Sequence, residues 1–422
     1  MWSPKRIDIG WGDLLAAAAR SATSGEAESL ASGIEGEWSP EGDALACLSV
    51  RSAFDLLLTA LNLPPGSEVL VSAVTIGDMP RIVESHGLAA VPVDLNPATM
   101  APRADTLARA LSPRSRAVLA AHLFGGRIDL GPIADFARSH DLMLIEDAAQ
   151  AFAGPDYTGH PASDVSMFSF GPIKTATALG GAIVRVRDQQ LRQRMRDIQA
   201  GWPAQKRRHF LTRVAKYAVL KGASSRPGYG AVVRACRVLG RDHDRLVNGS
   251  IRGFADGDFF SLIRQRPSAP LLSLLRRRLQ HFDNRQIADR IERAEQVMGN
   301  WRGTALFPGS ASVPHAHWLL PICVAHPRHL ITTLAAAGYD ATQGRSLIAV
   351  PPPAGRPDLD PVTARQVLER VVYLPCYSEM TPAAVKRLTR LIAAYRATES
   401  SAQLGPACIF GWRRVTMTNI IS

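Results

Sequence analysis

Hydrophobic residues recur along the first half of the chain in two alternating patterns. Apolar runs of strand length lie within residues 67–76, 88–95, 115–125 and 142–152. Between such runs, segments such as residues 52–63 and 78–87 place apolar residues at the spacing of one helix face. A strand–helix–strand rhythm of this kind is typical of parallel pairing. The pattern therefore predicts a mainly parallel sheet that helices cover on both faces.

The second half of the chain predicts a smaller α/β unit. A long helical pattern over residues 284–301 is expected to bridge two domains. Further strand-like and helix-like segments lie within residues 315–324, 329–340 and 364–395. A chain of 422 residues is long enough for two cores. We predict a large domain over residues 1–283, a small C-terminal domain over residues 284–397, and a tail of unknown structure over residues 398–422.

A basic stretch interrupts this organisation at about residues 203–258. Residues 206–222 predict a helix with Phe210, Val214 and Tyr217 on one face, and residues 231–247 predict a second basic helix after a break at SSRPGYG. Two interpretations are open. The insertion packs on its own subunit or a dimer partner, which we favour, or it lies on an anionic membrane surface.

Composition excludes several classes of protein. The net charge is +12, which by itself does not identify a partner, and we expect no nucleic-acid ligand. No apolar run is long enough to cross a bilayer, and the five cysteines are scattered without CxxC spacing. These features predict a cytoplasmic protein with reduced thiols and no metal site. Walker, GxGxxG and HExxH motifs are absent from the sequence.

Two neighbouring stretches suggest pyridoxal-phosphate chemistry. Lys174 is the single lysine in an uncharged segment, DVSMFSFGPIKTATALGGAIV, where loss of hydration would lower its pKa. A neutral amine of this kind condenses with an aldehyde. Just upstream, the apolar run LMLIED delivers Asp147 to the carboxyl end of a buried strand, where ligands gather in open α/β sheets. A carboxylate there would keep a pyridine nitrogen protonated, so that the ring acts as an electron sink.

The motifs EDAAQ, FSFGPIK and GGAIV, in this order, resemble the DegT/DnrJ/EryC1/StrS family of aminotransferases. The resemblance implies an aspartate-aminotransferase-like (fold type I) α/β fold with a large mixed, mainly parallel sheet domain. It also implies pyridoxal 5'-phosphate as cofactor and a homodimer. The implied reaction, as in sugar and polysaccharide biosynthesis, transfers an amino group, usually from glutamate, to a nucleotide-linked keto sugar. Two alternatives stay open: an enzyme of the same cofactor with other chemistry or a non-sugar substrate, and a non-catalytic relative whose insertion binds an anion.

The resemblance assigns a role to each of six residues. Lys174 is the catalytic residue and holds the cofactor aldehyde, while Asp147 pairs with the pyridinium nitrogen. Gln150 donates to the ring hydroxyl. The cofactor phosphate is expected to contact Ser169, Arg51 and Ser52.

Several positions depart from the family pattern or leave a choice. Ile76 stands where the family places a ring-stacking aromatic residue, and the loop after Lys174 is two residues shorter than usual. His122 either approaches the cofactor ring or is a buried histidine satisfied by the backbone, and both interpretations are kept. Arg264 occupies the position of a family asparagine that contacts the partner subunit's phosphate.

Overall fold

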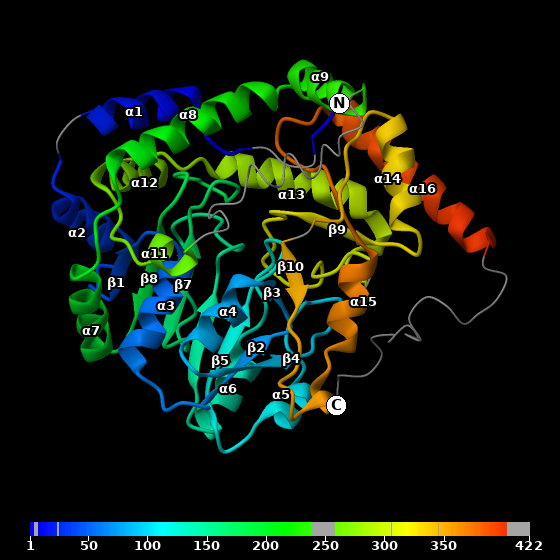
Figure 1. Ribbon diagram of the computed structural model, residues 1–422. Helices are drawn as coiled ribbons and strands as arrows, with labels where there is room; N and C mark the ends of the chain where they lie inside the picture. The colour runs from blue at the N-terminus through cyan, green and yellow to red at the C-terminus, as the bar shows by residue number, and fades with distance from the viewer. Residues whose placement is uncertain (4–6, 23–24, 239–257, 305, 345, 403–422) are drawn as a thin grey trace.

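The computed structural model describes residues 1–3, 7–22, 25–238, 258–304, 306–344 and 346–402. A seven-stranded sheet with the order β1-β8-β7-β6-β5-β2-β4 lies at its centre, between layers of helices (Figure 1). Strands β4, β2, β5, β6 and β7 are parallel to one another, whereas β8 is antiparallel to both β7 and β1. The predicted fold class, a large mixed and mainly parallel sheet, is confirmed.

The strands of the described chain are short and mostly buried. Their bounds are β1 Ala44–Cys47, β2 Glu68–Ser72, β3 Val74–Ile76, β4 Ala89–Val93, β5 Ser115–Ala121, β6 Met143–Asp147, β7 Val165–Ser169, β8 Ala182–Val186, β9 Leu320–Cys323, β10 Leu347–Ala349 and β11 Val371–Leu374.

The helices form the outer layers. Their bounds are α1 Trp11–Ala22, α2 Ala27–Trp38, α3 Val50–Leu61, α4 Asp78–Ser85, α5 Ala104–Ala110, α6 Gly131–Ser139, α7 Gln189–Ala200, α8 Arg207–Ala223, α9 Arg226–Val238, α11 Phe259–Ile263, α12 Ala269–Gln280, α13 Asn284–Met298, α14 Pro327–Ala336, α15 Val362–Arg370 and α16 Pro382–Ala402, with short 3₁₀ turns η1 Gly299–Trp301 and η2 Pro357–Leu359.

The sheet is buried on both faces, which explains why its strands read as continuous apolar runs. On one face, β-strand residues such as Leu45 and Val71 pack with α3, α4 and α7. On the other face, Ala44 packs in a cluster with α1, α2, α8 and α12, and Leu70 packs in a cluster with α5 and α6.

The predicted strand over residues 67–76 is two strands. Ser72 ends β2 in the main sheet, and β3 leaves the sheet to pair with β10, with Ile76 opposite Leu347. Ala73, between the two strands, donates its N–H to the carbonyl of Val93 and accepts from the N–H of Val350. The change of partner cannot be read locally, because β10 is more than 270 residues away.

The insertion packs partly as predicted. Phe210, Val214 and Tyr217 are the buried residues of α8, which lies against α1 and α12 of the same chain (Figure 1). The expected break at SSRPGYG is shorter than predicted, because α9 already begins at Arg226. Residues 239–257, which include part of the second predicted helix, lie outside the described residues.

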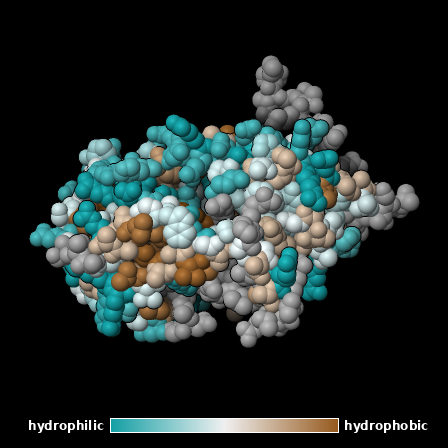
Figure 2. Space-filling view, turned by 90° about the horizontal axis from the view of Figure 1, so that it is seen from above, coloured by the Kyte–Doolittle hydropathy of each residue, from teal (hydrophilic) through white to brown (hydrophobic). Residues whose placement is uncertain are grey.

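The outer face of α1 and α8 exposes apolar side chains. Trp11 and Leu15 of α1 are 53% and 71% exposed, and Leu211 and Val219 of α8 are 43% and 72% exposed. Figure 2 shows apolar side chains gathered among hydrophilic ones on the face seen from above. No helix in the described part of the chain is both long and apolar enough to cross a membrane.

The C-terminal part has its own core. Helices α13, α14 and α16 pack with the antiparallel pair β9–β11 around buried residues such as Leu320, Val372 and Leu388. The helix α13 begins at Asn284, next to the predicted boundary at 283/284, while β10 pairs with β3 of the preceding part. The division into domains stays a prediction. The helix α16 runs to Ala402, and residues 403–422 of the predicted tail are outside the described residues.

Candidate functional site

A cleft lies at the carboxyl ends of β6 and β7, beside the N-terminus of α3. It encloses about 1500 Å³ of empty space including its open mouth. The floor comes from the strand ends and the α3 terminus, and the wall opposite comes from later segments that include Trp318, Leu347 and Tyr373. Of the six residues that the sequence singles out, five line this cleft: Arg51, Asp147, Gln150, Ser169 and Lys174.

Lys174 sits on a turn just after β7, where its N–H donates to the carbonyl of Gly171 at 3.0 Å. Its Nζ lies 4.2 Å from the centre of the Trp318 ring. The Trp318 indole N–H donates to the carbonyl of Ile173 at 2.8 Å, which fixes the ring beside the lysine. An aromatic face attracts the ammonium form of a lysine and also displaces water from it. The Trp318 ring therefore reduces the hydration of the Lys174 amine.

Trp318 was not identified from the sequence. It belongs to a loop that folds against the HLFGG turn, where Ala316 donates its N–H to the carbonyl of Gly125 at 2.8 Å. Gly125 has a positive φ of 100°, and a Cβ there would lie 2.4 Å from the Trp318 nitrogen. Only glycine permits this close approach. In the sequence, Gly125 is the signal that another segment, the Trp318 loop, packs against this turn.

Asp147 ends β6 and lies between Ala121 of β5 and Met167 of β7. One carboxylate oxygen accepts the N–H of Ala149 at 2.9 Å. Burial raises the pKa of Asp147, and this effect outweighs the lowering by the Ala149 N–H and by the positive charge of Lys174. A half-buried carboxylate that has lost part of its hydration is stabilised by a cationic N–H donor. The residue thus fits a protonated pyridine nitrogen.

Gln150 is oriented by its neighbour in the HLFGG turn. The N–H of Phe124 donates to the Gln150 side-chain oxygen at 3.0 Å. Because the oxygen is used in this way, the amide NH₂ is the end that remains for the cleft, which Gln150 lines. The residue fits the predicted role of a hydrogen-bond donor to a ring hydroxyl.

His122 is a buried histidine that belongs to a polar network below the cleft. The N–H of Ile128 donates to its Nδ1 at 3.1 Å, so the proton must sit on Nε2, which is 2.9 Å from a Glu146 oxygen. Tyr157 and Ser166 donate to the same carboxylate at 2.5 and 2.6 Å. Of the two interpretations of His122, the structure supports a buried histidine whose ring nitrogens both have hydrogen-bond partners. One partner is the backbone N–H of Ile128, and the other is the Glu146 side chain.

The same network determines the ionisation of Glu146. Burial alone would raise the pKa of this carboxyl, but the hydrogen bonds from His122, Ser166 and Tyr157 lower the pKa to about 2. Glu146 is therefore charged and structural, as strand alternation predicts.

The N-terminus of α3 presents a serine to the cleft, but not the predicted one. Ser49 lines the cleft and caps α3 by accepting the Ser52 N–H at 3.1 Å. Ser52 is buried behind it and shares a 2.8 Å hydrogen bond between the two hydroxyls. Arg51 lines the cleft and pairs through Nε with Asp78. A phosphate contact of Ser52 remains a prediction, and the geometry favours Ser49 for that position.

Arg213 of α8 also reaches the cleft, and the sequence did not single it out. Its Nη1 donates to the carbonyl of Leu179 at 3.1 Å, and no described carboxylate forms an ion pair with it. Burial lowers the pKa of this guanidinium. A Cβ on Gly180 would lie 3.0 Å from Nη1, so the Gly-Gly pair that begins β8 makes room for the arginine. The insertion thus brings a cation into the cleft that Ser49 and Ser169 also line.

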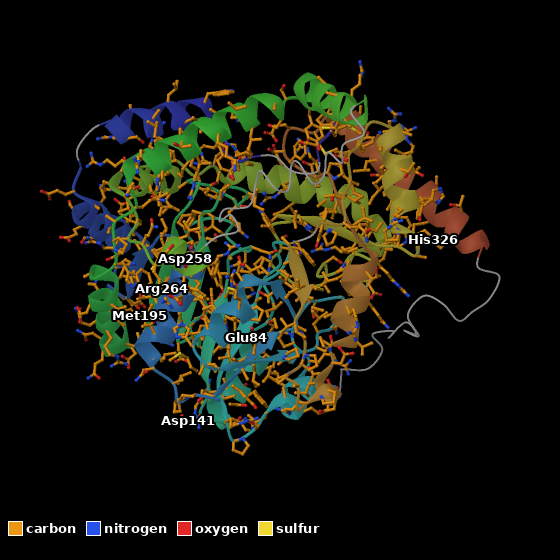
Figure 3. All side chains as sticks on the ribbon, in the orientation of Figure 1. Glu84, Asp141, Met195, Asp258, Arg264 and His326 are labelled. Carbon is orange, nitrogen blue, oxygen red and sulfur yellow. The ribbon has the colours of Figure 1, made fainter. Side chains whose placement is uncertain are left out.

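Arg264 does not have a free guanidinium for a partner's anion. It lies at the end of α11, with Asp258 at the other end (Figure 3). Its Nε and Nη2 donate to the two oxygens of Asp55 at 2.8 and 2.9 Å. Asp55 is fully buried and also contacts His86 at 3.1 Å. The planar fork is used to neutralise a carboxylate of its own chain.

Other expectations concern Ile76 and metals. Ile76 lines the cleft, as predicted for the position of a ring-stacking residue. Ser169 also lines it, and its hydroxyl accepts the Gly171 N–H at 3.4 Å. The described residues contain no cluster of three or more side chains able to hold a metal ion.

Comparisons with known proteins agree with the motifs. Residues 36–223 match the model of the DegT/DnrJ/EryC1/StrS aminotransferase family. The chain is 35% identical over 156 residues to GDP-perosamine synthase of Caulobacter vibrioides, a match that covers 36% of this chain and 42% of the relative. The chain spans less than half the length of the curated relatives it matches.

Solved structures share the fold over almost the whole chain. The aminotransferase TlmJ of Streptoalloteichus hindustanus is 18% identical, with a TM-score of 0.68 over 94% of this chain and 100% of that chain. A protein of Streptococcus pneumoniae, described as a sugar aminotransferase in its PLP form, is 14% identical, with a TM-score of 0.65 over 93% of this chain and 98% of that chain. Residues 36–223 are thus similar in sequence to the DegT/DnrJ/EryC1/StrS aminotransferase family, and the solved structures share the fold.

Proposed function

We propose that this chain is a pyridoxal-phosphate-dependent aminotransferase that transfers an amino group, from glutamate, to a nucleotide-linked keto sugar. One observation carries the proposal: Lys174 and the half-buried carboxylate of Asp147 line the same cleft, within electrostatic reach of each other. The match of residues 36–223 to the family model supports the reaction class. The donor and the sugar come from the family resemblance and are the finer part of the proposal.

The residues present fit the cofactor from end to end. Lys174 would hold the aldehyde end, Asp147 the pyridine nitrogen and Gln150 the ring hydroxyl. At the far end, the N-terminus of α3 with its cap Ser49 provides backbone N–H groups and a positive dipole for a phosphate. Arg213 adds a full positive charge to the same cleft.

Pyridoxal phosphate, when bound, supplies the electron sink that lets a carbon beside the amine lose a proton. The remaining work belongs to the protein. The Lys174 amine would move that proton as general acid and base, since Lys174 lies on the turn after β7 and its Nζ lies against the Trp318 ring. Trp318 limits water around the amine, and Asp147 keeps its charge against the ring nitrogen. Ile76 covers the cleft by apolar contact without aromatic stacking.

We also infer a homodimer in the cytoplasm. The family completes its sites from two subunits, and the cleft of this chain is open at its mouth. Four cysteines, Cys47, Cys236, Cys323 and Cys376, are buried as free thiols, which suits a reducing compartment. Contact of the basic insertion, about residues 203–258, with a membrane surface remains the less favoured alternative.

A spectroscopic titration tests the proposed function. The purified protein should show the absorbance band of the lysine-bound cofactor, and glutamate should convert it to the band of the aminated form. A nucleotide-linked keto sugar should then restore the first band. A protein that never shows a cofactor band would be a non-catalytic relative. A band that glutamate leaves unchanged would point to another reaction or another donor.

A further inference from the structure

A second cavity lies beside the main cleft, next to α13. Its empty space, about 760 Å³ including its opening to solvent, is bordered by the Lys174 turn, the helix α13 and the segment after β11. Lys174 and Trp318 line both this cavity and the main cleft. A molecule that reacts at the lysine can therefore extend into either space.

Arg290 of α13 lines this second cavity with few of its donors used. Its Nε donates to the carbonyl of Ala316 at 2.7 Å. Its Nη2 is sealed from solvent and has no hydrogen-bond partner among the described residues. A guanidinium carries five N–H groups, so most of the N–H groups of Arg290 have no acceptor among the described residues.

The carboxylates nearest to Arg290 do not neutralise it. The two oxygens of Asp8 are taken by the Arg278 guanidinium at 3.2 Å and by the Ala176 N–H at 2.6 Å. Glu379 lines the cavity but is an exposed residue, and it accepts the hydroxyl of Ser378 at 3.2 Å. No described carboxylate lies within ion-pair distance of Arg290. Burial accordingly lowers the pKa of this guanidinium, an effect that Asp8 only partly opposes.

The position of Arg290 relative to the lysine is fixed by one short segment. Ala316 accepts the hydrogen bond from Arg290, and two residues later Trp318 contacts the Lys174 amine and bonds to Ile173. The cation and the reactive amine are thus held by the same loop, on the wall of the same cavity. Removing a charge from water without giving it a partner is costly, and a half-buried arginine whose Nη2 is sealed from solvent beside a cavity is suited to bind an anion.

We propose that Arg290 binds the α-carboxylate of the amino donor, an inference that rests on the proposed function. The donor amine reacts at the position of Lys174, and an amino acid carries its carboxylate on the same carbon as that amine. A cation is therefore needed in the space next to the lysine, where Arg290 lies. The keto acceptor has no such carboxylate, so the subsite serves the donor half-reaction alone.

The test compares donors on the holoenzyme. The apparent dissociation constant of glutamate is measured from the decrease of the lysine-bound cofactor band. Arg290→Gln is expected to raise this constant about tenfold or more, because a charged hydrogen bond is lost. Arg290→Lys keeps the charge and should recover part of the affinity. Arg285→Gln, an exposed arginine on the same helix, is the matched control and should behave as wild type. Cofactor content should be equal in all variants.

The acceptor half-reaction provides the internal reference. The apparent constant for the keto sugar, measured on the aminated enzyme, should stay within about twofold in Arg290→Gln. An unchanged constant for glutamate in that variant overturns the inference, and so does an equal loss for donor and acceptor.

A ligand-binding measurement separates this inference from the proposed function. Glutarate should raise the melting temperature of the wild-type protein, whereas 1,5-pentanediol, which lacks carboxylates, should not. The effect of glutarate should be lost in Arg290→Gln. If that variant fails to fold, the effect should be reduced in Arg290→Lys. This pattern in a protein without any cofactor band would leave the carboxylate subsite standing while the aminotransferase function failed. No glutarate effect in wild type, or an equal effect in the variants, would overturn the subsite.

Discussion

Replacing Arg213 separates a cofactor contact from a structural one. Arg213→Met removes a guanidinium that has one hydrogen bond to the chain, from Nη1 to the carbonyl of Leu179, and no described carboxylate partner. In the protein without cofactor, the lost hydrogen bond costs about 1 kcal/mol, and relief of the buried charge offsets a similar amount. The free energy of unfolding of the apoprotein should therefore change by no more than about 1 kcal/mol.

Cofactor binding should respond much more strongly to the same change. A charge-assisted hydrogen bond to a phosphate contributes about 1.5–3 kcal/mol. Its loss in Arg213→Met should make the dissociation constant of the cofactor roughly ten- to hundredfold larger. The assay is titration of the apoprotein with pyridoxal phosphate followed by absorbance, alongside urea unfolding. Arg213→Lys should lie between wild type and Met, and Arg208→Met on the exposed side of α8 should resemble wild type.

Two results would refute this reasoning about Arg213. Wild-type affinity for the cofactor in Arg213→Met would mean that the arginine lies away from the phosphate. A loss of more than about 3 kcal/mol in apoprotein stability would mean that the residue is mainly structural, because such losses accompany the breaking of a buried network.

Three further predictions follow from contacts in and around the cleft. Gly180→Ala places a Cβ 3.0 Å from Arg213 Nη1, so it should weaken cofactor binding in the titration, yet add little in the Arg213→Met background. The pKa of Glu146 is lowered to about 2, so its contribution to the free energy of unfolding, about 3 kcal/mol in all, should be fully present above about pH 4.5 and be lost as the pH falls toward 2. Glu146→Gln should remove this pH dependence between about pH 4.5 and 2 in urea unfolding. An unchanged pH dependence would contradict the assigned pKa. Sedimentation should give a dimer for the active enzyme, whereas a monomer of full activity would contradict the homodimer.

The local pattern predicted the elements that lie in the sheet but missed those that depend on distant partners. Apolar runs located β2, β4, β5 and β6 because both faces of these strands are buried. The polar stretch before Trp38 conceals α2, of which Ile34, Glu35 and Trp38 are buried. Glu35 is buried as the acceptor of the Ala46 N–H and the partner of Arg196, contacts that no local period reveals.

The candidate site divides in the same way. Lys174, Asp147 and Gln150 were found because short motifs carry them and strand ends bring them to one edge of the sheet. Trp318 and Arg213 were missed because each arrives from a segment whose local sequence is that of an ordinary loop or helix. Their places are fixed by close backbone approaches at glycines, which a single sequence shows only as glycine.

The most direct test of the account is to find where the cofactor is attached. Borohydride reduction of the holoenzyme, followed by proteolysis and mass spectrometry, should place the pyridoxyl group on the peptide that contains Lys174. The same treatment of Lys174→Ala should yield no labelled peptide, while Lys216→Ala, an exposed lysine on α8, should be labelled as wild type. A label on any other lysine of the native holoenzyme, or one that survives in Lys174→Ala, would contradict the assignment of the cleft.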